Sequence, residues 1–424
     1  MKFFRPKQTR LFLLNPRFRS TKTQQPRTSL FCISNLSQSE YRSYFIHQKK
    51  INIYFPNFFQ IVAMKQLVRR CNSKWPTSVL SSHGDCSYDL ILLKSLPYLR
   101  KCILSYSFES VLTKGSSKLF IKSPSLKVLS FNAGRTGCWD DQILYLKNLI
   151  TANRRIEELF LELEEPAGSL SFIRNSYDFF KSLNLTLPFL KHFDLNFIMR
   201  GSQRSYEIIP DSPDRPSDDH IITFFGQGIS KCLNLKFLKF SVSFSVSLTG
   251  EGIAQFGKYI SSIEGLQSLY LDIQSLRVFQ FYSSLLLSLE EGINILIESF
   301  SSSKSLHNLF LPYLCQSFSS EIVQRIMFSL SKISSLKHLC LSFRSETQGF
   351  DNLAGFDSMI TGLRHLESLK VEINSKALNL DNFHKVANSL RNAHNLKHFK
   401  WDFGLSDTVV SSQDNQNVQN TVGF

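Results

Sequence analysis

Large apolar residues recur along most of the chain in a phrase with fixed internal spacing. If the first apolar residue of each phrase is position 0, others follow at positions +3 and +5 and usually at +7. The phrase occurs ten times, and its position-0 residues are Leu99, Leu126, Ile156, Leu190, Leu235, Leu266, Leu306, Leu336, Leu366 and Leu396. The last three intervals are each 30 residues. A pattern of this length predicts one repeated structural unit.

Each unit contains a predicted strand and a predicted helix. The apolar residues at +3, +5 and +7 alternate with other residues at +4 and +6, which predicts a short strand with one buried face. In seven units apolar residues also stand at −13, −10 and −6, as in Ile253, Phe256 and Ile260, and these steps place them on one helical face. Neither element buries its apolar face alone, so we expect neighbouring units to stack around a shared core.

One of these predicted helices contains the motif Gly252-x-x-x-x-Gly257-Lys258. The motif resembles a phosphate-binding loop, but Tyr259 stands where such a loop needs Ser or Thr to bind magnesium. Phe256, inside the motif, occupies position −10 of its unit. We therefore expect a helix of the repeat here and no nucleotide site.

The L-x-x-L-x-L phrases, spaced about 30 residues apart and alternating with amphipathic helices, resemble the leucine-rich repeats of the ribonuclease-inhibitor type. The resemblance covers residues 90–403. It implies an α/β horseshoe-shaped solenoid of about ten repeats of ~30 residues, with parallel strands on the concave face and helices on the convex face. The family usually has Asn or Cys at +8, whereas here Asn374 is the one Asn at that position. We expect the apolar residue at +7 to extend the strand instead.

Charge and composition divide the chain into three parts. Residues 1–84 contain 15 Lys and Arg and one acid, whereas residues 85–424 contain 34 Lys and Arg and 33 acids. We predict a basic, disordered tail or poorly defined N-terminal segment at 1–84, the repeat solenoid at 85–403 and a polar tail at 404–424. Because the formal charge of residues 85–424 is only +1, we expect nucleic acid to bind through the N-terminal tail if it binds at all.

Residues 1–84 admit several roles. The first 34 residues are rich in Arg and Ser and contain no acid, as in a mitochondrial presequence, so a nuclear or mitochondrial location is an alternative to the cytoplasm. Phe55 to Trp75 occupies the place where proteins with such repeats often carry an F-box, although the Leu-Pro opening and the acidic residues of that motif are missing. No run of about 18 apolar residues occurs, so no membrane span is predicted.

No catalytic or metal-binding motif accompanies the repeat. The sequence has no G-x-S-x-G or H-E-x-x-H motif, and its eight cysteines form no C-x-x-C pair, which favours reduced thiols in the cytosol or nucleus. His192, His338 and His398 share position +2, but the last two lie two predicted strands apart, about 10 Å, which is too far to bind one zinc ion. We predict no catalytic residue, no cofactor and no metal site.

Positions +4 and +6 are predicted to face the concave surface. In the middle units position +4 carries large rings, and the last two units carry charges of both signs at +4 and +6. We predict partner-binding residues at Phe160, Tyr270, Phe310, Lys370, Lys400, Glu372 and Asp402. Rings surrounded by charges are typical of protein-binding surfaces. An alternative is that the rings pack on one another or are covered by the apolar insertion at Ser275–Gly292.

These features favour a non-enzymatic scaffold that presents its concave surface to an unidentified protein partner. The resemblance to repeat proteins leaves two other roles open. One is a substrate-receptor subunit of an F-box-type ubiquitin ligase, and the other is a GTPase-activating protein resembling the Ran type.

Overall fold

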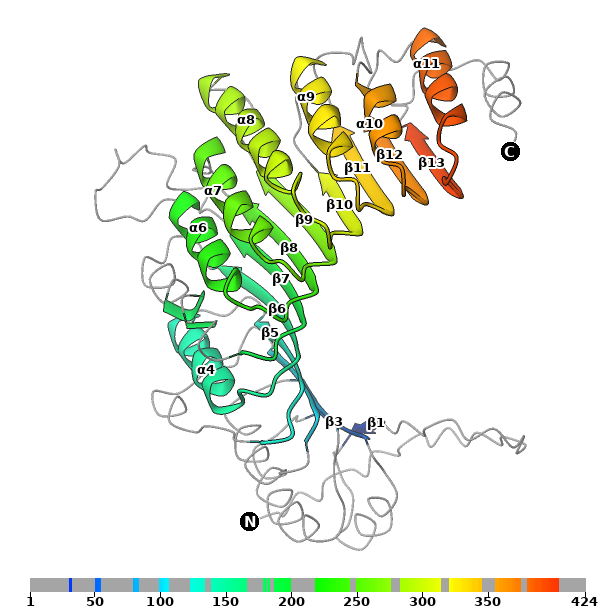
Figure 1. Cartoon of the computed structure of the whole chain (residues 1–424). Coiled ribbons are helices and arrows are strands. Elements are labelled where there is room, and N and C mark those ends of the chain that lie inside the picture. Colours follow the sequence, from blue (N-terminus) through cyan, green and yellow to red (C-terminus); the bar gives the residue numbers. More distant parts are fainter. Residues whose placement is uncertain are drawn as a thin grey trace, which may run out of the picture.

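The computed structural model describes residues 30–32, 50–54, 79–83, 99–106, 123–133, 139–165, 178–180, 182–183, 187–199, 218–244, 249–275, 283–313, 320–344, 355–374 and 380–403. Within these residues strands and helices alternate along the chain and build the predicted α/β solenoid of leucine-rich repeats. Figure 1 shows the sheet on the inner side of the curve and the helices on the outer side.

The described strands form one 13-stranded sheet in which neighbours in the sheet are neighbours in the chain. They are β1 (Leu30–Cys32), β2 (Lys50–Tyr54), β3 (Val79–His83), β4 (Lys101–Tyr106), β5 (Val128–Ala133), β6 (Glu158–Glu165), β7 (His192–Met199), β8 (Phe237–Phe244), β9 (Ser268–Ser275), β10 (Asn308–Tyr313), β11 (His338–Arg344), β12 (Ser368–Asn374) and β13 (His398–Phe403). The helices are α4 (Trp139–Ala152), α6 (Asp218–Ile229), α7 (Gly250–Ser261), α8 (Ser283–Ser299), α9 (Ser320–Ser331), α10 (Phe356–Gly362) and α11 (Leu380–Arg391). Each strand pairs in parallel with the next.

The sheet begins before residue 85, where the sequence predicts the solenoid to start. Strands β1, β2 and β3 lie within residues 1–84 and continue the parallel pairing from β4. In the sequence, Pro26 precedes Leu30 by four residues, and Gln48 and Thr77 precede Lys50 and Val79 by two, at the spacing where later units have Leu or Ile. The missing apolar residue at position 0 explains why the sequence pattern does not extend to them. The rest of residues 1–84, and the predicted polar tail at 404–424, lie outside the described residues.

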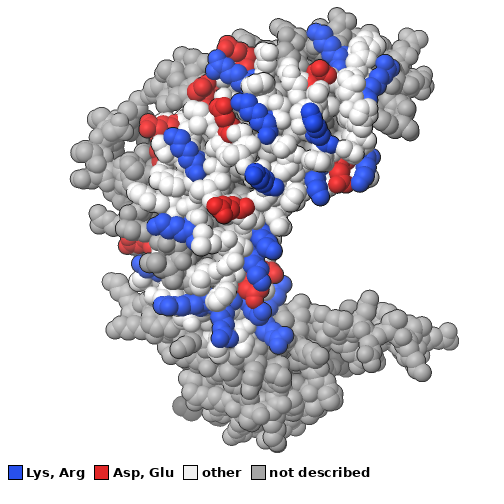
Figure 2. Space-filling model, viewed as in Figure 1, with Lys and Arg blue, Asp and Glu red and all other residues white. Residues whose placement is uncertain are grey.

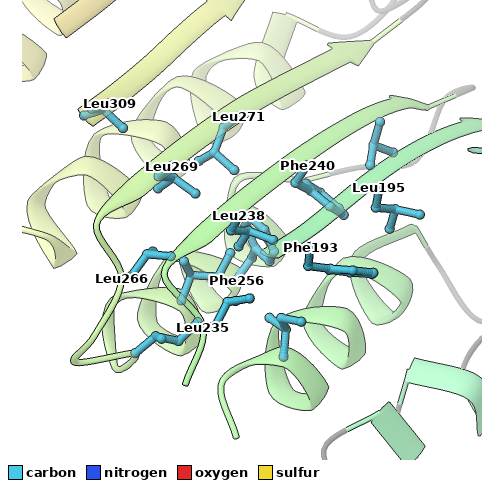
Figure 3. Packing of buried hydrophobic residues seen from close by; sticks show 14 of the residues in the cluster. Phe193, Leu195, Leu235, Leu238, Phe240, Phe256, Leu266, Leu269, Leu271 and Leu309 are labelled. Carbon is cyan, nitrogen blue, oxygen red and sulfur yellow. The ribbon is translucent and has the colours of Figure 1, made fainter. Parts of the chain in front are cut away.

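The ten position-0 residues lie in one continuous core, as predicted. Nine of them are at most 3% exposed, and the tenth, Leu396, packs against the same cluster. Strand residues at +3 and +5 face the helices across this core, as Figure 3 shows for Leu238 and Phe240 of β8, which lie against Phe256 of helix α7. A shared core of this kind is how leucine-rich repeats stabilise units that are too small to fold alone.

The predicted helical faces and the strand extension are also confirmed. In α7 the side chains of Ile253, Phe256 and Ile260 are fully buried. The residue at +7 is buried in the units of β6, β7 and β8, at Leu163, Phe197 and Val242. Strands β6, β7, β8 and β9 are each eight residues long.

The glycine motif lies inside α7 and serves helix packing. A Cβ atom at Gly257 would lie 2.7 Å from the Cα of Leu296 on α8, and one at Gly252 would lie 2.3 Å from Asp219 Oδ1 on α6. Real Cβ atoms essentially never approach other atoms this closely. Glycine therefore lets α7 pack tightly between its two neighbours, and the prediction of a repeat helix here is confirmed.

The two long insertions end in helices of the repeat. The first insertion, in the 45-residue interval between Leu190 and Leu235, leads into α6. Asp219 in the first turn of α6 accepts hydrogen bonds through its carboxylate from the backbone N–H of Thr249 at 2.7 Å and from the Thr249 hydroxyl at 2.6 Å. Thr249 is the N-cap of α7, so this bond fixes the start of α7 against α6. The apolar insertion at Ser275–Gly292 contains the first part of α8, a 17-residue helix. Residues 201–217 and 276–282 lie outside the described residues.

Backbone hydrogen bonds link the starts of successive strands. At the start of each strand, the carbonyl at position +1 accepts two N–H groups of the next unit, as Lys127 O does from Glu157 at 2.7 Å and Glu158 at 3.0 Å. The same pattern recurs from Arg100 to Glu367. The buried side chain of Asn153 adds a further link, because its Oδ1 accepts from the backbone N–H of Ser123 at 2.8 Å.

Candidate functional site: the concave face

The side chains at position +4 form one continuous row across the sheet. Strand pairing places each +4 residue opposite the next one, from the unit of β4 to that of β13. In chain order the row is Ile103, Ser130, Phe160, Asp194, Lys239, Tyr270, Phe310, Cys340, Lys370 and Lys400. Because +3 and +5 point into the core, this row lies on the concave face. Adjacent strands are about 4.8 Å apart, so neighbours in the row are within contact distance.

Phe160 belongs to a stack of three rings that crosses β6, β7 and β8. Its ring centroid lies 4.8 Å from that of His192, and His192 stacks on Phe237 at 4.1 Å with an interplanar angle of 22°. His192 and Phe237 are paired residues at position +2 of their strands. Partial burial lowers the pKa of His192, which favours the uncharged ring inside the stack.

Lys239 connects its two neighbours in the row. Its Nζ lies 3.1 Å from Asp194 Oδ2 and 5.6 Å from the centroid of the Tyr270 ring. Both charged side chains are partly exposed, so we expect the ion pair to contribute at most about 1 kcal/mol to stability. Its main effect is to order the surface between the ring stack and Tyr270.

Tyr270 and Phe310 form a second group of rings on β9 and β10. They are paired across the two strands, and their ring centroids are 6.3 Å apart. Just beyond them the register shifts, so that Tyr313 pairs with Asp272. Pro312 stands at the shift, and its lack of an N–H group removes one possible ladder hydrogen bond. The ladder between β9 and β10 is therefore irregular beside the central rings.

The last units carry the predicted mixed charges. Lys370 forms a salt bridge with Glu372 on the same strand, and the hydrogen bond from Lys370 is the largest cause that lowers the pKa of Glu372. Lys370 lies opposite Lys400, and Glu372 lies opposite Asp402, whose side chain is not described. Positive and negative side chains thus occupy adjacent rows on β12.

The described part of the concave face contains no cluster of metal-binding side chains, and its thiol is not activated. Among the described residues, no three His, Cys, Asp or Glu side chains lie close enough together to hold a metal ion. Burial is the main cause that raises the pKa of the partly buried thiol of Cys340, which disfavours the nucleophilic thiolate.

The structure brings the predicted site residues together in three groups. Tyr270 and Phe310 are in contact, and Lys370, Lys400, Glu372 and Asp402 lie on neighbouring strands. Phe160 lies three strands from Tyr270, and Asp194 and Lys239 occupy the row between them. Phe237 is not among the predicted partner-binding residues, which all lie at +4 and +6, because it stands at +2. Extending the same alternation to +2 would have found it.

No protein-family model matches the chain, and no curated protein has a matching sequence. The crystal structure of the TLR13–ssRNA13 complex is similar with a TM-score of 0.32 and 12% identity, covering 86% of this chain and 51% of that chain. The structure of the Toll–Spatzle complex of Drosophila is similar with a TM-score of 0.29 and 11% identity, covering 88% of this chain and 52% of that chain. The chain thus spans about half the length of these structures. Likenesses this distant carry no argument about partners.

Two further expectations concern regions or properties beyond the concave face. The segment Phe55 to Trp75, considered above for an F-box, lies outside the described residues. None of the described helices combines the length and apolar character needed to cross a bilayer. A Ran-type GTPase-activating role stays a prediction that an assay of GTP hydrolysis would test.

Proposed function

We propose that this chain is a non-enzymatic scaffold that binds a protein partner along the concave face. The observation that supports this most is the +4 row, in which rings and charges are aligned in register and partly exposed. Its centre is Lys239, Tyr270 and Phe310, with the ring stack at Phe160 on one side and the charges at Lys370 on the other. Aromatic anchors with charges around them are the composition of protein-binding surfaces.

The same proposal assigns the repeats to the ribonuclease-inhibitor-like type. Support comes from the helices between strands, since α6, α7, α9 and α11 each have 12 residues. Helices of this length separate the units most on the convex side and curve the sheet around the partner. A concave surface formed in this way contacts an extended area of a folded protein.

The test is affinity purification of the full chain, with quantification of the proteins that bind. The variant Tyr270→Ala/Phe310→Ala removes the two central rings while leaving the buried core positions unchanged. Removal of buried aromatic anchors costs about 2 kcal/mol or more each, so we expect the specific partner to decrease by more than tenfold. The matched control is Phe328→Ala, because Phe328 is 55% exposed and lies on helix α9.

The control variant should retain the partner at the wild-type level. If the concave variant retains it while folding normally, or if Phe328→Ala removes it, the proposed surface is wrong. A reaction catalysed by the purified chain on the bound protein would contradict the non-enzymatic role.

A further inference from the structure

The charges of the solenoid are separated between one edge and the rest of the molecule. We name as the strand-start edge the described residues from position −5 to position +2 of the ten units, which form the helix-to-strand turns and the first residues of the strands. This edge contains 14 Lys and Arg against four Glu, a formal charge of +10. The remaining described residues from 99 to 403 contain eight Lys and Arg against 19 Asp and Glu, a formal charge of −11.

All the basic residues of the strand-start edge are exposed. They are Arg100, Lys101, Lys127, Arg154, Arg155, Lys191, Lys231, Lys236, Lys304, Lys332, Lys337, Arg364, Arg391 and Lys397. Because the strands are parallel and in register, the turns before them all lie on one side of the solenoid. Figure 2 shows Lys and Arg side chains at intervals along this side. The net formal charge of the solenoid is close to zero and so does not reveal this separation of positive and negative side chains.

The ends of the helices account for only part of this charge. Helices α4 and α6 to α11 all end near the strand-start edge, and a helix C-terminus carries about half a negative elementary charge. The described helices together thus attract roughly three to four positive charges. The surplus on this edge is larger, and we infer that it has a partner outside the chain.

Two exposed apolar side chains stand within the strand-start edge. Phe189 is 53% exposed and Leu233 is 83% exposed. They lie on adjacent turns, which are joined by a hydrogen bond of 2.8 Å from Asn234 Nδ2 to Pro188 O. An exposed leucine alone is ordinary, but two large apolar residues on neighbouring turns form a patch.

The repeat fold does not require these apolar residues. At position −2 the other described units have Pro, Arg, Glu, Lys, Ser or His, and at position −1 they have Ser, Arg, Asn, Gly or His. Leu233 and Phe189 are the large apolar exceptions at these positions among the described units. Lys191 follows Phe189 by two residues, and Lys231 and Lys236 flank Leu233. Exposed lysines thus lie close in sequence to both Phe189 and Leu233.

We propose that the strand-start edge docks on an anionic phospholipid membrane surface. Lysines near such a surface are attracted to its negative headgroups, and apolar side chains beside them insert into the boundary between headgroups and acyl chains. Leu233 favours this partner over a nucleic acid. An aliphatic side chain cannot stack on bases, whereas it gains directly from leaving water for the acyl boundary. The edge lies beside the concave face, which stays open to a protein partner in the docked chain.

The test measures binding of the full chain to phosphatidylcholine vesicles with and without phosphatidylserine, by flotation. We expect binding that depends on phosphatidylserine and weakens with added salt. The variant Lys231→Gln/Lys236→Gln should weaken it by about fivefold for each lysine. Leu233→Ser should weaken it roughly tenfold, the value of burying one leucine side chain. All three substitutions are at exposed positions, so the fold should be unaffected, and circular dichroism checks this.

Matched controls come from the helices. Arg325→Gln/Lys385→Gln removes two exposed basic side chains from the middle of α9 and α11, and Leu144→Ser removes a side chain of α4 that is 43% exposed. Neither should change vesicle binding by more than twofold, an estimate that follows from the distance of these side chains from the edge. Equal losses from edge and control variants would overturn the proposal, because the overall charge of the chain would then explain the binding. Binding that neither set of variants weakens would also overturn it, because the basic segment 1–84 would then explain the binding.

Two further results would also overturn it. One is equal binding to vesicles with and without phosphatidylserine, or no binding to either. The other is tight binding to single-stranded poly-uridine RNA that Leu233→Ser leaves unchanged, together with no binding to vesicles, which would assign the edge to nucleic acid. The concave variant Tyr270→Ala/Phe310→Ala should bind vesicles normally, so failure of this proposal and failure of the proposed function are distinguishable.

Discussion

At the scale of single residues, Glu157 shows how side chains at position +1 tie neighbouring units together. Its carboxylate accepts from Lys127 Nζ at 2.6 Å and from Lys191 Nζ at 2.8 Å, in the units before and after its own. These hydrogen bonds lower the pKa of Glu157 from 4.5 to about 2, and the hydrogen bond from Lys127 has the larger effect. The folded chain therefore binds this proton less tightly than the unfolded chain does.

The pH dependence of stability follows from this shift. The contribution of Glu157 is fully present above about pH 4.5 and is lost as the pH falls toward about 2. Because both lysines are exposed, we expect it to be less than about 1 kcal/mol. Urea unfolding of the wild type and Glu157→Gln should differ at pH 6 and converge at about pH 2 to 3. Glu264→Gln is the control, because it removes an exposed carboxylate from the same edge. If the difference in unfolding free energy between the wild type and Glu157→Gln grows toward low pH, the stabilising role of Glu157 is wrong.

At the scale of elements, the helices pack as closely as the glycines between them permit. Gly257→Ala gains about 1 kcal/mol of helix propensity but places a Cβ 2.7 Å from the Leu296 backbone. Overpacking of this kind costs roughly 1–3 kcal/mol, and backbone atoms cannot move aside as a flexible side chain can. We therefore expect net destabilisation in urea unfolding. The neighbouring Lys258 is exposed, so Lys258→Ala should change stability by no more than about 0.5 kcal/mol. Stabilisation by Gly257→Ala would show that α7 and α8 lie further apart.

The sequence predicts the units in which apolar residues follow both the two-residue period of a strand and the three-to-four-residue spacing of a helix. Buried positions require apolar residues, and in each unit these are position 0, the alternate strand positions up to +7 and one face of the preceding helix. Because such positions recur at regular spacing, they are visible in the sequence. Strand β3 was missed because Thr77 and Ser82 stand at positions 0 and +5, where the pattern needs apolar residues. Phe237 was missed for a different reason. The strand alternation places it at +2 on the concave face, but its contact with His192 depends on a neighbouring unit 45 residues away in sequence.

At the scale of the whole molecule, stacking brings together residues that are about 30 positions apart in the chain. The +4 row and the strand-start edge both arise in this way, and neither is visible as a continuous stretch of sequence. Net charge is the clearest case, since +10 on one edge and −11 elsewhere sum to almost nothing. We propose that the solenoid uses two surfaces formed in this way, the concave face for a protein and the adjoining strand-start edge for an anionic surface.

The most direct test of the central claim places a photo-crosslinking amino acid at Phe310 in the full chain and, separately, at Phe328. Phe310 lies in the concave row on β10, whereas Phe328 lies on α9 and is exposed. The account predicts a covalent adduct with one defined protein from position 310, lost in the Tyr270→Ala background, and no such adduct from position 328. An adduct with that protein from position 328 alone would contradict the account.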